Sequence, residues 1–477
     1  MAMSNDELPE GWTSAPFSEV TVEPAQRVPG ATEQITYIDI GSVDRDTKKV
    51  TQPQTMVGKD APSRARKVIK TGDVLVSTVR PNLNAVALVD SQYDGQFAST
   101  GFDVLRSSVL DPRWAFFAVR TPEFVERMTE LVQGALYPAV RSKDVRAFVI
   151  PIAPLAEQKR IADKLEAVLG RVAACRARLD RVPDLLKRFR QAVLAAATSG
   201  QLTEEWRKES GAQTQLEHPF ASAEAPDGSA ELPQSWQWVS VGTLATKVTD
   251  GVHKKPHYVE DGVPFLTVKS LTAGRGISFE VNNFISTEDH QEFTKRTLPE
   301  KDDILVTKDG TLGVVRLIDT DRVFSIFVSL ALIKLRDRRM SHYVTYALKS
   351  AVVQKQMVGV GTGLQHIHLR DLREDLIPVP PLAEQQESVR RVEALFAFAD
   401  RIEARLTEAR AQVERLTPAT LAKAFRGELV PQDPNDEPAS ALLARIRGST
   451  AIEPAGSRKG VAVGELRGPE PCSPTSL

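Results

Sequence analysis

The sequence is poor in cysteine, in net charge and in long apolar runs, and each shortage excludes a class of protein. Only Cys175 and Cys472 occur among 477 residues, so neither a disulfide framework nor a cysteine-based zinc site can form, and a reducing cytoplasm fits best. Lys and Arg number 61 against 62 Asp and Glu, which excludes a uniformly basic coat protein but allows local basic faces. No run approaches the roughly 18 apolar residues of a membrane-spanning helix, and Met1 to Trp12 lacks the pattern of a signal peptide.

A long internal repeat dominates the chain. The segment from Ile150, IPIAPLAEQK, matches the segment from Ile377, IPVPPLAEQQ, at seven of ten positions. This offset of 227 residues continues without a gap to Leu202 and Leu429, and the regions before each motif match more loosely. The period is far longer than the roughly 20–50 residues of a solenoid repeat. It therefore indicates a duplicated domain in a molecule with pseudo-two-fold symmetry.

The conserved half of each repeat carries an apolar heptad seam. Apolar residues recur in alternating steps of four and three over Ile161–Val193 and again over Val392–Leu416, which predicts two long helices in an antiparallel coiled coil. Gly200 and Gly427 stand where glycines commonly end helices. The alternative is that the two helices belong separately to the cores of globular domains. The narrow apolar seam favours the coiled coil over this alternative. We expect a kink or break at the two prolines in the pattern, Pro183 and Pro418.

The variable half of each repeat is predicted to be a mixed α/β domain. Short β-branched runs predict strands at Val74–Val79, Asn84–Val89, Pro264–Val268, Ile304–Thr307 and Val314–Ile318, and helices are expected near 122–132 and 341–357. The fold class is α/β (α+β), with two such domains separated by the helices of the coiled coil. The expected boundaries are 8–150 and 232–377 for the two domains, 151–202 and 378–430 for the spacer helices, 203–231 for a mobile linker and 431–477 for a disordered tail.

Motifs that would carry catalysis are missing or fit another role better. There is no Gly-x-x-x-x-Gly-Lys-Ser/Thr loop and no Asn/Asp-Pro-Pro-Tyr/Phe motif, and the glycines of 359–363 follow a helix rather than a strand, unlike a dinucleotide site. Glu157-Gln-Lys159 has half of a nuclease pattern, but its repeat partner Glu384 has no such lysine, which favours a carboxylate at a helix start. The histidine pairs at 253 and 257 and at 366 and 368 have metal-like spacing without a nearby cysteine, so donors to a polyanion are favoured over zinc.

The paired motifs at 150 and 377, each opening a long helix, resemble those of the DNA specificity subunit of type I restriction–modification systems. The helix-end motifs 195–202 and 422–429 support this resemblance, which spans residues 8 to 430. The first variable domain departs from the family's loop motifs, because it has RPNLN at 80–84 where the second has GTLG at 310–313. The second domain carries three such motifs, namely Asp250-Gly251-x-His253, KDGTLG at 308–313 and Gln365-His-Ile367.

The resemblance implies that each variable domain is a target recognition domain that reads one half of a bipartite, asymmetric DNA site. The helical spacer would set the gap of unread base pairs and dock two modification subunits, which use S-adenosylmethionine to methylate adenine. Two restriction subunits would supply the motor and nuclease, using ATP and magnesium. This chain would have no catalytic residue, metal or cofactor of its own, and would take part in phage defence.

Candidate DNA ligands are basic, amide and imidazole side chains on the predicted loops. Phosphate contacts position a protein on DNA, whereas contacts to base edges specify the sequence. The alternative for each residue is an ordinary solvated side chain. The expected phosphate ligands are Arg64, Arg66, Lys67 and Lys70 in the first domain and Lys254, Lys255, Lys295 and Arg296 in the second. The expected base readers are Arg80, Asn82, Asn84, His253, His257 and Gln365, with Lys308 and His366 completing the interface.

Two other classes of protein stay open from the sequence. A fused methyltransferase or nuclease with unrecognised motifs would turn over S-adenosylmethionine or cut DNA as the isolated chain. A coiled-coil adaptor that binds only protein would assemble without retaining DNA of a particular sequence.

Overall fold

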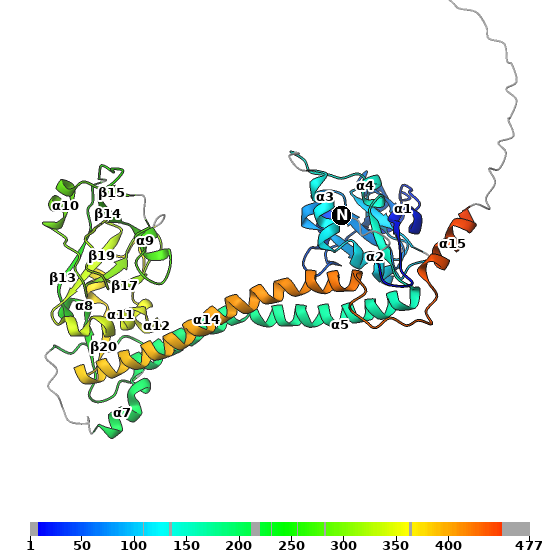
Figure 1. Cartoon of the computed structure of the whole chain (residues 1–477). Helices are drawn as coiled ribbons and strands as arrows, with labels where there is room; N and C mark the ends of the chain where they lie inside the picture. Colours follow the sequence, from blue (N-terminus) through cyan, green and yellow to red (C-terminus); the bar gives the residue numbers. More distant parts are fainter. Residues whose placement is uncertain are drawn as a thin grey trace, which may run out of the picture. The chain divides into compact units, whose positions relative to one another are not determined.

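The structure, a computed structural model, describes residues 8–107, 109–132, 136–210, 220–229, 231–254, 256–280, 283–361 and 365–450. The chain divides into two compact units, residues 1–177 with 411–477 (unit 1) and residues 178–410 (unit 2). Each unit holds one variable domain together with parts of the long helices (Figure 1). Within the described ranges, no helix has the length and apolar character needed to cross a membrane.

The variable domain of unit 1 contains two small sheets, a two-stranded clasp and the two-stranded hairpin of β3 (Val43–Asp44) and β4 (Lys49–Val50). One sheet is antiparallel and has the order β10-β7-β8, and the other is mixed and has the order β5-β2-β9-β6, with β2 and β9 parallel. The clasp pairs β1 (Thr13–Pro16) with β11 (Val149–Ile152), so the domain begins and ends at one place. The sheet strands are β2 (Gln34–Ile38), β5 (Gln54–Val57), β6 (Ala65–Val68), β7 (Val74–Ser77), β8 (Val86–Leu88), β9 (Phe97–Ser99) and β10 (Phe102–Leu105). Its helices include α1 (Phe17–Val20), α2 (Pro112–Ala118), α3 (Pro122–Glu130) and α4 (Ser142–Arg146).

Unit 2 repeats this connectivity. Its antiparallel sheet has the order β13-β19-β16-β17, its mixed sheet has the order β15-β14-β18 with β14 and β18 parallel, and its clasp pairs β12 with β20. All the strands predicted in the two domains are present. The helix predicted over 341–357 divides into α11 and α12. The strands are β12 (Gln237–Ser240), β13 (Ala245–Asp250), β14 (Val263–Leu266), β15 (Phe284–Ile285), β16 (Ile304–Thr307), β17 (Val315–Leu317), β18 (Ser325–Ile326), β19 (Leu330–Leu335) and β20 (Leu376–Val379). The helices include α8 (Val241–Leu244), α9 (Val268–Thr272), α10 (Thr287–Thr294), α11 (Ser341–Lys349), α12 (Ala351–Gln354) and α13 (Leu369–Glu374).

The long helices pair antiparallel within each unit. The first spacer helix breaks before Pro183, as expected, into α5 (Leu155–Leu179) and α6 (Val182–Ser199), whereas α14 (Leu382–Phe425) continues through Pro418. In unit 1, Arg176 of α5 forms an ion pair with Glu414 of α14. In unit 2, Arg190 of α6 contacts Asp400, and Asp180, just before α6, contacts Arg410, so residue numbers in α14 fall as those in the first spacer helix rise. This confirms the predicted antiparallel coiled coil as a local arrangement in each unit.

The buried seam departs from the predicted heptads at two positions. Leu165, Val172 and Leu406 are buried as expected, but Cys175 and Leu416 are exposed. Beyond Val413 the buried side of α14 moves by one residue and continues to Leu421 and Ala424. A straight helix has 3.6 residues per turn and drifts about 20° from a seven-residue repeat in each heptad, which explains such a shift.

Each variable domain is completed by a helix end from the other half of the sequence. In unit 1 the ring of Phe425, at the end of α14, lies 4.6 Å from Trp114, which in turn contacts Trp12 at 5.6 Å. In unit 2, Leu194 and Ala197, near the end of α6, share a buried cluster with Tyr346. Each structural unit therefore combines a domain from one half of the sequence with a helix end from the other half.

The two helix-terminal glycines adopt left-handed backbone and meet the prolines that open the domains. Gly427 has φ +72°, and a Cβ there would lie 2.5 Å from Cγ of Pro9. Gly200 has φ +80°, and a Cβ there would lie 2.6 Å from Cγ of Pro233. The Leu-Pro pairs at 8–9 and 232–233 thus each meet a helix-end glycine, and this contact recurs in both units.

Parts of the predicted linker and tail are ordered, which corrects two expectations. After α6, α7 (Glu204–Glu209) follows directly, and Arg207 donates through Nε to the buried Glu384 at 2.9 Å. In the tail, α15 (Ala439–Thr450) buries Leu442 and Leu443 in the core of unit 1, and Arg447 pairs with Glu19. Composition misses both segments because a few apolar and charged contacts are enough to fix a short helix on an existing core. Residues 211–219, 230 and 451–477 lie outside the described ranges.

A matched pair of glycine substitutions tests the helix-end contact. Gly200→Ala is expected to lower the free energy of unfolding of the full chain by about 1–2 kcal/mol, because an L-residue is strained in left-handed backbone and its Cβ would meet Pro233. Gly170→Ala, inside α5 and with open space at Cβ, is expected to raise it by about 0.5–1 kcal/mol. Urea unfolding followed by circular dichroism measures both, and equal effects from the two variants would contradict the contact.

Candidate DNA interface

In unit 2 a buried carboxylate gathers three basic side chains from distant parts of the sequence. Asp250 ends β13, and its side chain is only 4% exposed. Arg296 Nη2 donates to Asp250 Oδ1 at 2.7 Å, and His253 Nε2 lies 3.2 Å from the same oxygen. Nζ of Lys308, which follows β16, lies 3.6 Å from Asp250 Oδ2. Arg296 and His253 remain more than half exposed, so one carboxylate holds basic side chains at the surface.

The glycine-containing motifs bring the loops of this face together. A Cβ on Gly251 would lie 2.0 Å from the carbonyl oxygen of Ile326, so β13 and β18 can approach this closely only with glycine there. Asp309 forms a β-bridge with His366, and Ile367 N–H donates to the Lys308 carbonyl at 2.8 Å. The motifs at 250, 308 and 365 therefore form one surface.

Unit 1 has the same backbone frame at the corresponding strand ends. Thr78 stands where unit 2 has Lys308, and its carbonyl accepts from Val140 N–H at 2.9 Å. Val79 forms a β-bridge with Ala139, as Asp309 does with His366. Arg80 N–H donates to the carbonyl of Pro138 at 2.8 Å, which places the RPNLN loop beside the segment 136–139. The frame is shared, whereas the side chains that it presents differ.

Two predicted DNA ligands of unit 1 are engaged inside the domain. Lys67 is only 6% exposed, and its Nζ lies 3.8 Å from the buried carboxylate of Asp103, which Arg146 also contacts. Burial lowers the pKa of Lys67 more than Asp103 raises it. Asn84 uses Nδ2 to donate to the Val119 carbonyl at 2.8 Å, and its Oδ1 accepts from Lys48 at 3.1 Å. Both side chains are therefore held by contacts within the domain, and a Lys or Asn in a loop sequence gives no sign of such contacts.

The other predicted residues occupy surfaces of different kinds. Arg66 is half-buried and donates to the Ser63 carbonyl at 2.8 Å, whereas Lys295 is exposed and pairs with Glu292, outside the Asp250 cluster. His366 is half-buried, its ring 4.5 Å from that of His368, and within the described ranges no group of three metal-ligating side chains occurs. Lys255 lies outside the described residues. The exposed candidates are Arg64, Lys70, Arg80, Asn82, Lys254, His257 and Gln365.

The motif glutamates at the helix starts are structural anchors. Glu157 is buried and accepts from Trp12 Nε1 at 3.0 Å, and burial raises its pKa. Glu384 is equally buried and accepts from Thr203 Oγ1 at 2.7 Å. Lys159 is exposed, so it does not meet Glu157 in the manner of a nuclease site.

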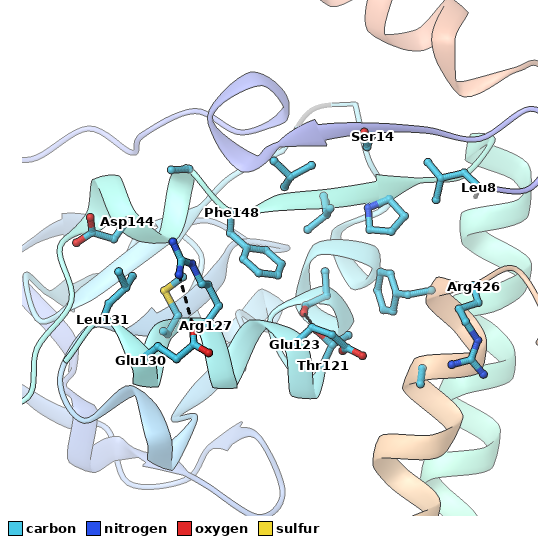
Figure 2. A pocket seen from close by; sticks show the side chains of 18 residues that line it. Leu8, Ser14, Thr121, Glu123, Arg127, Glu130, Leu131, Asp144, Phe148 and Arg426 are labelled. Carbon is cyan, nitrogen blue, oxygen red and sulfur yellow. Dashed lines mark hydrogen bonds and ion pairs between the residues drawn. The ribbon is translucent and has the colours of Figure 1, made fainter. Parts of the chain in front are cut away.

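A groove of about 690 Å³ in unit 1 lies between α3, β11 and the end of α14 (Figure 2). Arg127 pairs with Glu130 along this groove, and β11 begins beside it at Val149. In unit 2 the side chain of Gln356 lies against the corresponding strand, β20. Its Nε2 donates to the carbonyl of Leu376, the first residue of β20, and its Oε1 accepts from the N–H of the same residue. The groove also carries Glu123 and Asp144, and carboxylates disfavour a DNA backbone.

Asp250 has a larger role than its place in a motif suggested. The sequence pointed to the basic side chains, whereas the carboxylate that collects them was quoted only for the resemblance. An acidic residue at a strand end directly before glycine was the available signal. Lys48 and Arg120, two half-buried cations near the RPNLN loop, were not singled out at all.

Sequence comparisons match this chain to one class of protein. The family described as the type I restriction modification DNA specificity domain matches residues 233–410. The EcoBI specificity subunit of Escherichia coli is 32% identical over 352 residues, which cover 70% of this chain and 72% of that protein. The EcoKI specificity subunit of Escherichia coli strain K12 is 29% identical over 482 residues, which cover 94% and 97% of the two chains.

Solved structures agree with the sequence relatives. A chain from a type I R-M system studied for its complex assembly and conformational transition superposes with a TM-score of 0.71 at 28% identity, covering 88% of this chain and 99% of the other. The HsdS subunit from Thermoanaerobacter tengcongensis gives a TM-score of 0.61 at 27% identity, covering 88% and 98%. The chain belongs to the family of type I restriction enzyme specificity subunits.

Replacing the carboxylate beneath the basic cluster tests its structural role. Asp250→Asn is expected to lower the free energy of unfolding by about 1–3 kcal/mol, because Lys308 and Arg296 lose the charge that neutralises them. Asp309→Asn is the control, since its carboxylate is more exposed and lies 3.7 Å from Lys308. Chemical denaturation of both full-length variants measures the effect, and an equal loss from both would argue against Asp250 as the centre of the cluster.

Proposed function

We propose that this chain is the sequence-reading subunit of a type I restriction–modification complex, in which each variable domain reads one half of a bipartite, asymmetric DNA site. The observation that carries the proposal is the shared strand-end frame with different side chains. At equivalent positions, unit 1 presents Arg80 where unit 2 has glycine, whereas unit 2 presents Gln365 and His366 where unit 1 has Pro138 and Ala139. One scaffold with two sets of donors supports two different half-sites.

Basic and polar groups on each face suit the two parts of DNA recognition. In unit 2, Arg296 and Lys254 are the proposed phosphate ligands, and His253 and Gln365 the proposed base readers, whereas Lys308 is buried against Asp250 and supports this surface from below. In unit 1, Arg64 and Lys70 are the proposed phosphate ligands, and Arg80 and Asn82 the proposed base readers. Phosphate ligands give affinity on any sequence, whereas amide, imidazole and guanidinium groups at base edges give selectivity.

The long helices are the proposed spacer and docking surface. Large apolar side chains remain exposed on α6 and α14, among them Leu185, Phe398 and Leu416. Such side chains favour burial against another protein. We assign this surface to two modification subunits that carry S-adenosylmethionine and the adenine methylation chemistry. Two restriction subunits would supply ATP- and magnesium-dependent cleavage, and this chain would contribute recognition without catalysis.

Exchange of one domain tests the proposal directly. Residues 8–152 should be replaced by the matching segment of a related specificity subunit, so that β1 and β11 come from one parent and their clasp stays paired. The donor needs aromatic residues at the positions of Trp12 and Trp114, which support Phe425. Genome-wide mapping of methylated adenine is expected to show one altered half-site, with the other half-site and the gap unchanged.

The parental chain, mapped in the same host, is the control for this exchange. A chimaera that alters both half-sites, or a palindromic parental site, would contradict two independent readers. Methylation at no defined sequence, with an intact assembled complex, would favour a protein-only adaptor instead.

Lengthening the helix pair tests its role as spacer. Duplicating residues 186–192 of α6 together with 398–404 of α14 adds one heptad, about 10 Å, to each helix. These segments face each other, as the Arg190 contacts with Asp400 and Glu403 show, and neither contains the break before Pro183. Methylation mapping is expected to return the same half-sites with a longer gap, and an unchanged gap would contradict the spacer role.

A further inference from the structure

Two half-buried cations lie beside the RPNLN loop of unit 1. Nζ of Lys48 donates to the carbonyl oxygen of Asn84 at 2.6 Å. The side chain of Asn84 in turn donates to the carbonyl of Val119, the residue before Arg120. Asn84 thus joins the Lys48 turn to the end of α2. This juxtaposition places two positive charges next to the loop that also carries Arg80.

Neither cation has an ion-pair partner within the described ranges. Arg120 stacks on Phe116 and Phe117, at 4.8 and 5.3 Å from the ring centroids, and its Nε is buried without a hydrogen-bond partner among the described residues. Asp44 and Asp46 share the turn of Lys48, but the Asp44 carboxylate accepts from the N–H groups of Asp46 and Thr47. Burial and the charge of Arg120 lower the pKa of Lys48 to about 8, despite these carboxylates.

Backbone strain gathers at the same place. Outside glycine, the described residues have four positive φ angles, and three of them belong to Lys48, Arg80 and Asn84, with values of 58°, 49° and 44°. Left-handed backbone costs an L-residue about 1–2 kcal/mol. Strained residues cluster where a ligand requires a particular geometry, and an unneutralised cation pair is disfavoured unless an anion completes it.

Unit 2 has a related pair of cations. Trp114 and Tyr343 occupy equivalent positions, because each donates to the carbonyl of the proline in its own clasp strand, Pro151 or Pro378. The same spacing places Lys349 at the position of Arg120. Lys349 lies over the Tyr346 ring, and burial together with the charge of Arg316 lowers its pKa to about 8. The repeat therefore keeps a half-buried cation beside a second cation at this point.

We propose that Lys48 and Arg120 form a phosphate-binding site in unit 1 that holds one backbone phosphodiester of the DNA. This deepens the proposed function, since it rests on DNA binding by unit 1 and names a contact absent from the sequence-based list. Phosphate oxygens accept from guanidinium and ammonium groups and would neutralise both buried charges. Asn84, which contacts Lys48 and the carbonyl of Val119, would hold the RPNLN loop beside this site. A DNA backbone anchored at this site would bring the adjoining bases to Arg80 and Asn82.

The decisive experiment measures the reactivity of individual lysines in the full chain, assembled with its modification subunits. An amine-acylating reagent is applied at pH 8 to the free complex, with a mixed-sequence DNA duplex, or with inorganic phosphate, and peptides are quantified by mass spectrometry. Lys49, exposed and adjacent, is the internal control. A bound phosphodiester raises the pKa of Lys48, and a rise of one unit lowers its free-amine fraction about fivefold at pH 8. We expect DNA to protect Lys48 by at least that factor and Lys49 much less.

The possible outcomes separate the two sources of phosphate. Protection of Lys48 by DNA beyond that of Lys49 supports the site, whether or not free phosphate also protects. Protection by inorganic phosphate alone, or equal protection of both lysines, overturns it. If methylation mapping still shows a bipartite site, the recognition function stands without this contact. If the complex fails to retain DNA at all, the recognition function itself fails.

Substitutions provide a second readout. Lys48→Gln and Arg120→Gln are each expected to reduce the slope of log K against log salt by about 0.9, with the preference for the mapped site unchanged. Lys49→Gln is the matched control and should leave the slope unchanged. A slope unaffected by Lys48→Gln in a chain with unaltered thermal unfolding overturns the proposal. The labelling experiment uses the wild-type chain, so misfolding of a variant cannot obscure the result.

Discussion

The docking of a helix end onto the domain from the opposite half of the sequence is the contact on which both units depend. Phe425 lies against Trp114 in unit 1, and Leu194 and Ala197 share a cluster with Tyr346 in unit 2. A single repeat would contain a domain and a helix but not the helix end that covers that domain. Two repeats are therefore the smallest arrangement in which every domain is covered. The glycine–proline contacts at both helix ends have the same consequence, because each joins residues from different repeats.

The sequence predicted those features that repeat or alternate. The offset of 227 residues identified the duplication, the heptads identified antiparallel helices, and β-branched runs located the central strands. It did not predict features decided by single side-chain contacts. Helix α15 forms because Leu442 and Leu443 find an existing core, and the seam leaves Leu416 exposed because a straight helix drifts from its heptads. Neither the docking of α15 nor the drift of the seam changes the local amino-acid composition enough to be predicted from the sequence.

The candidate DNA interface likewise has features that the sequence predicted and features that it did not. The motifs indicated where the loops make close approaches and tight turns, because Gly251 and the glycines of 308–313 permit backbone geometries that other residues rarely adopt. The direction of each side chain within those loops was not predictable. Lys67 and Arg64 are three residues apart in one basic stretch, yet Lys67 is buried against Asp103 while Arg64 is exposed. The half-buried cations Lys48 and Arg120 lie far apart in sequence and come together only through Asn84.

Buried charge is used differently in the two domains, and this difference bears on how they diverge. Asp250 neutralises Lys308 and Arg296 from within unit 2, so the basic cluster around Asp250 is held by the protein itself, whereas Lys349 beside Arg316 has no ion pair within the described ranges. In unit 1 the carboxylate of Asp103 is occupied by Lys67 and Arg146, and Lys48 and Arg120 have no such partner within the described ranges. A surface that already contains its counter-charge tolerates changes in the loops above it, because the cluster remains neutralised. A surface that lacks one depends on its ligand for neutralisation, so its backbone geometry must fit that ligand closely. Of the four non-glycine residues with positive φ in the described ranges, Lys48, Arg80 and Asn84 lie beside these cations in unit 1, and Asp302 lies in unit 2.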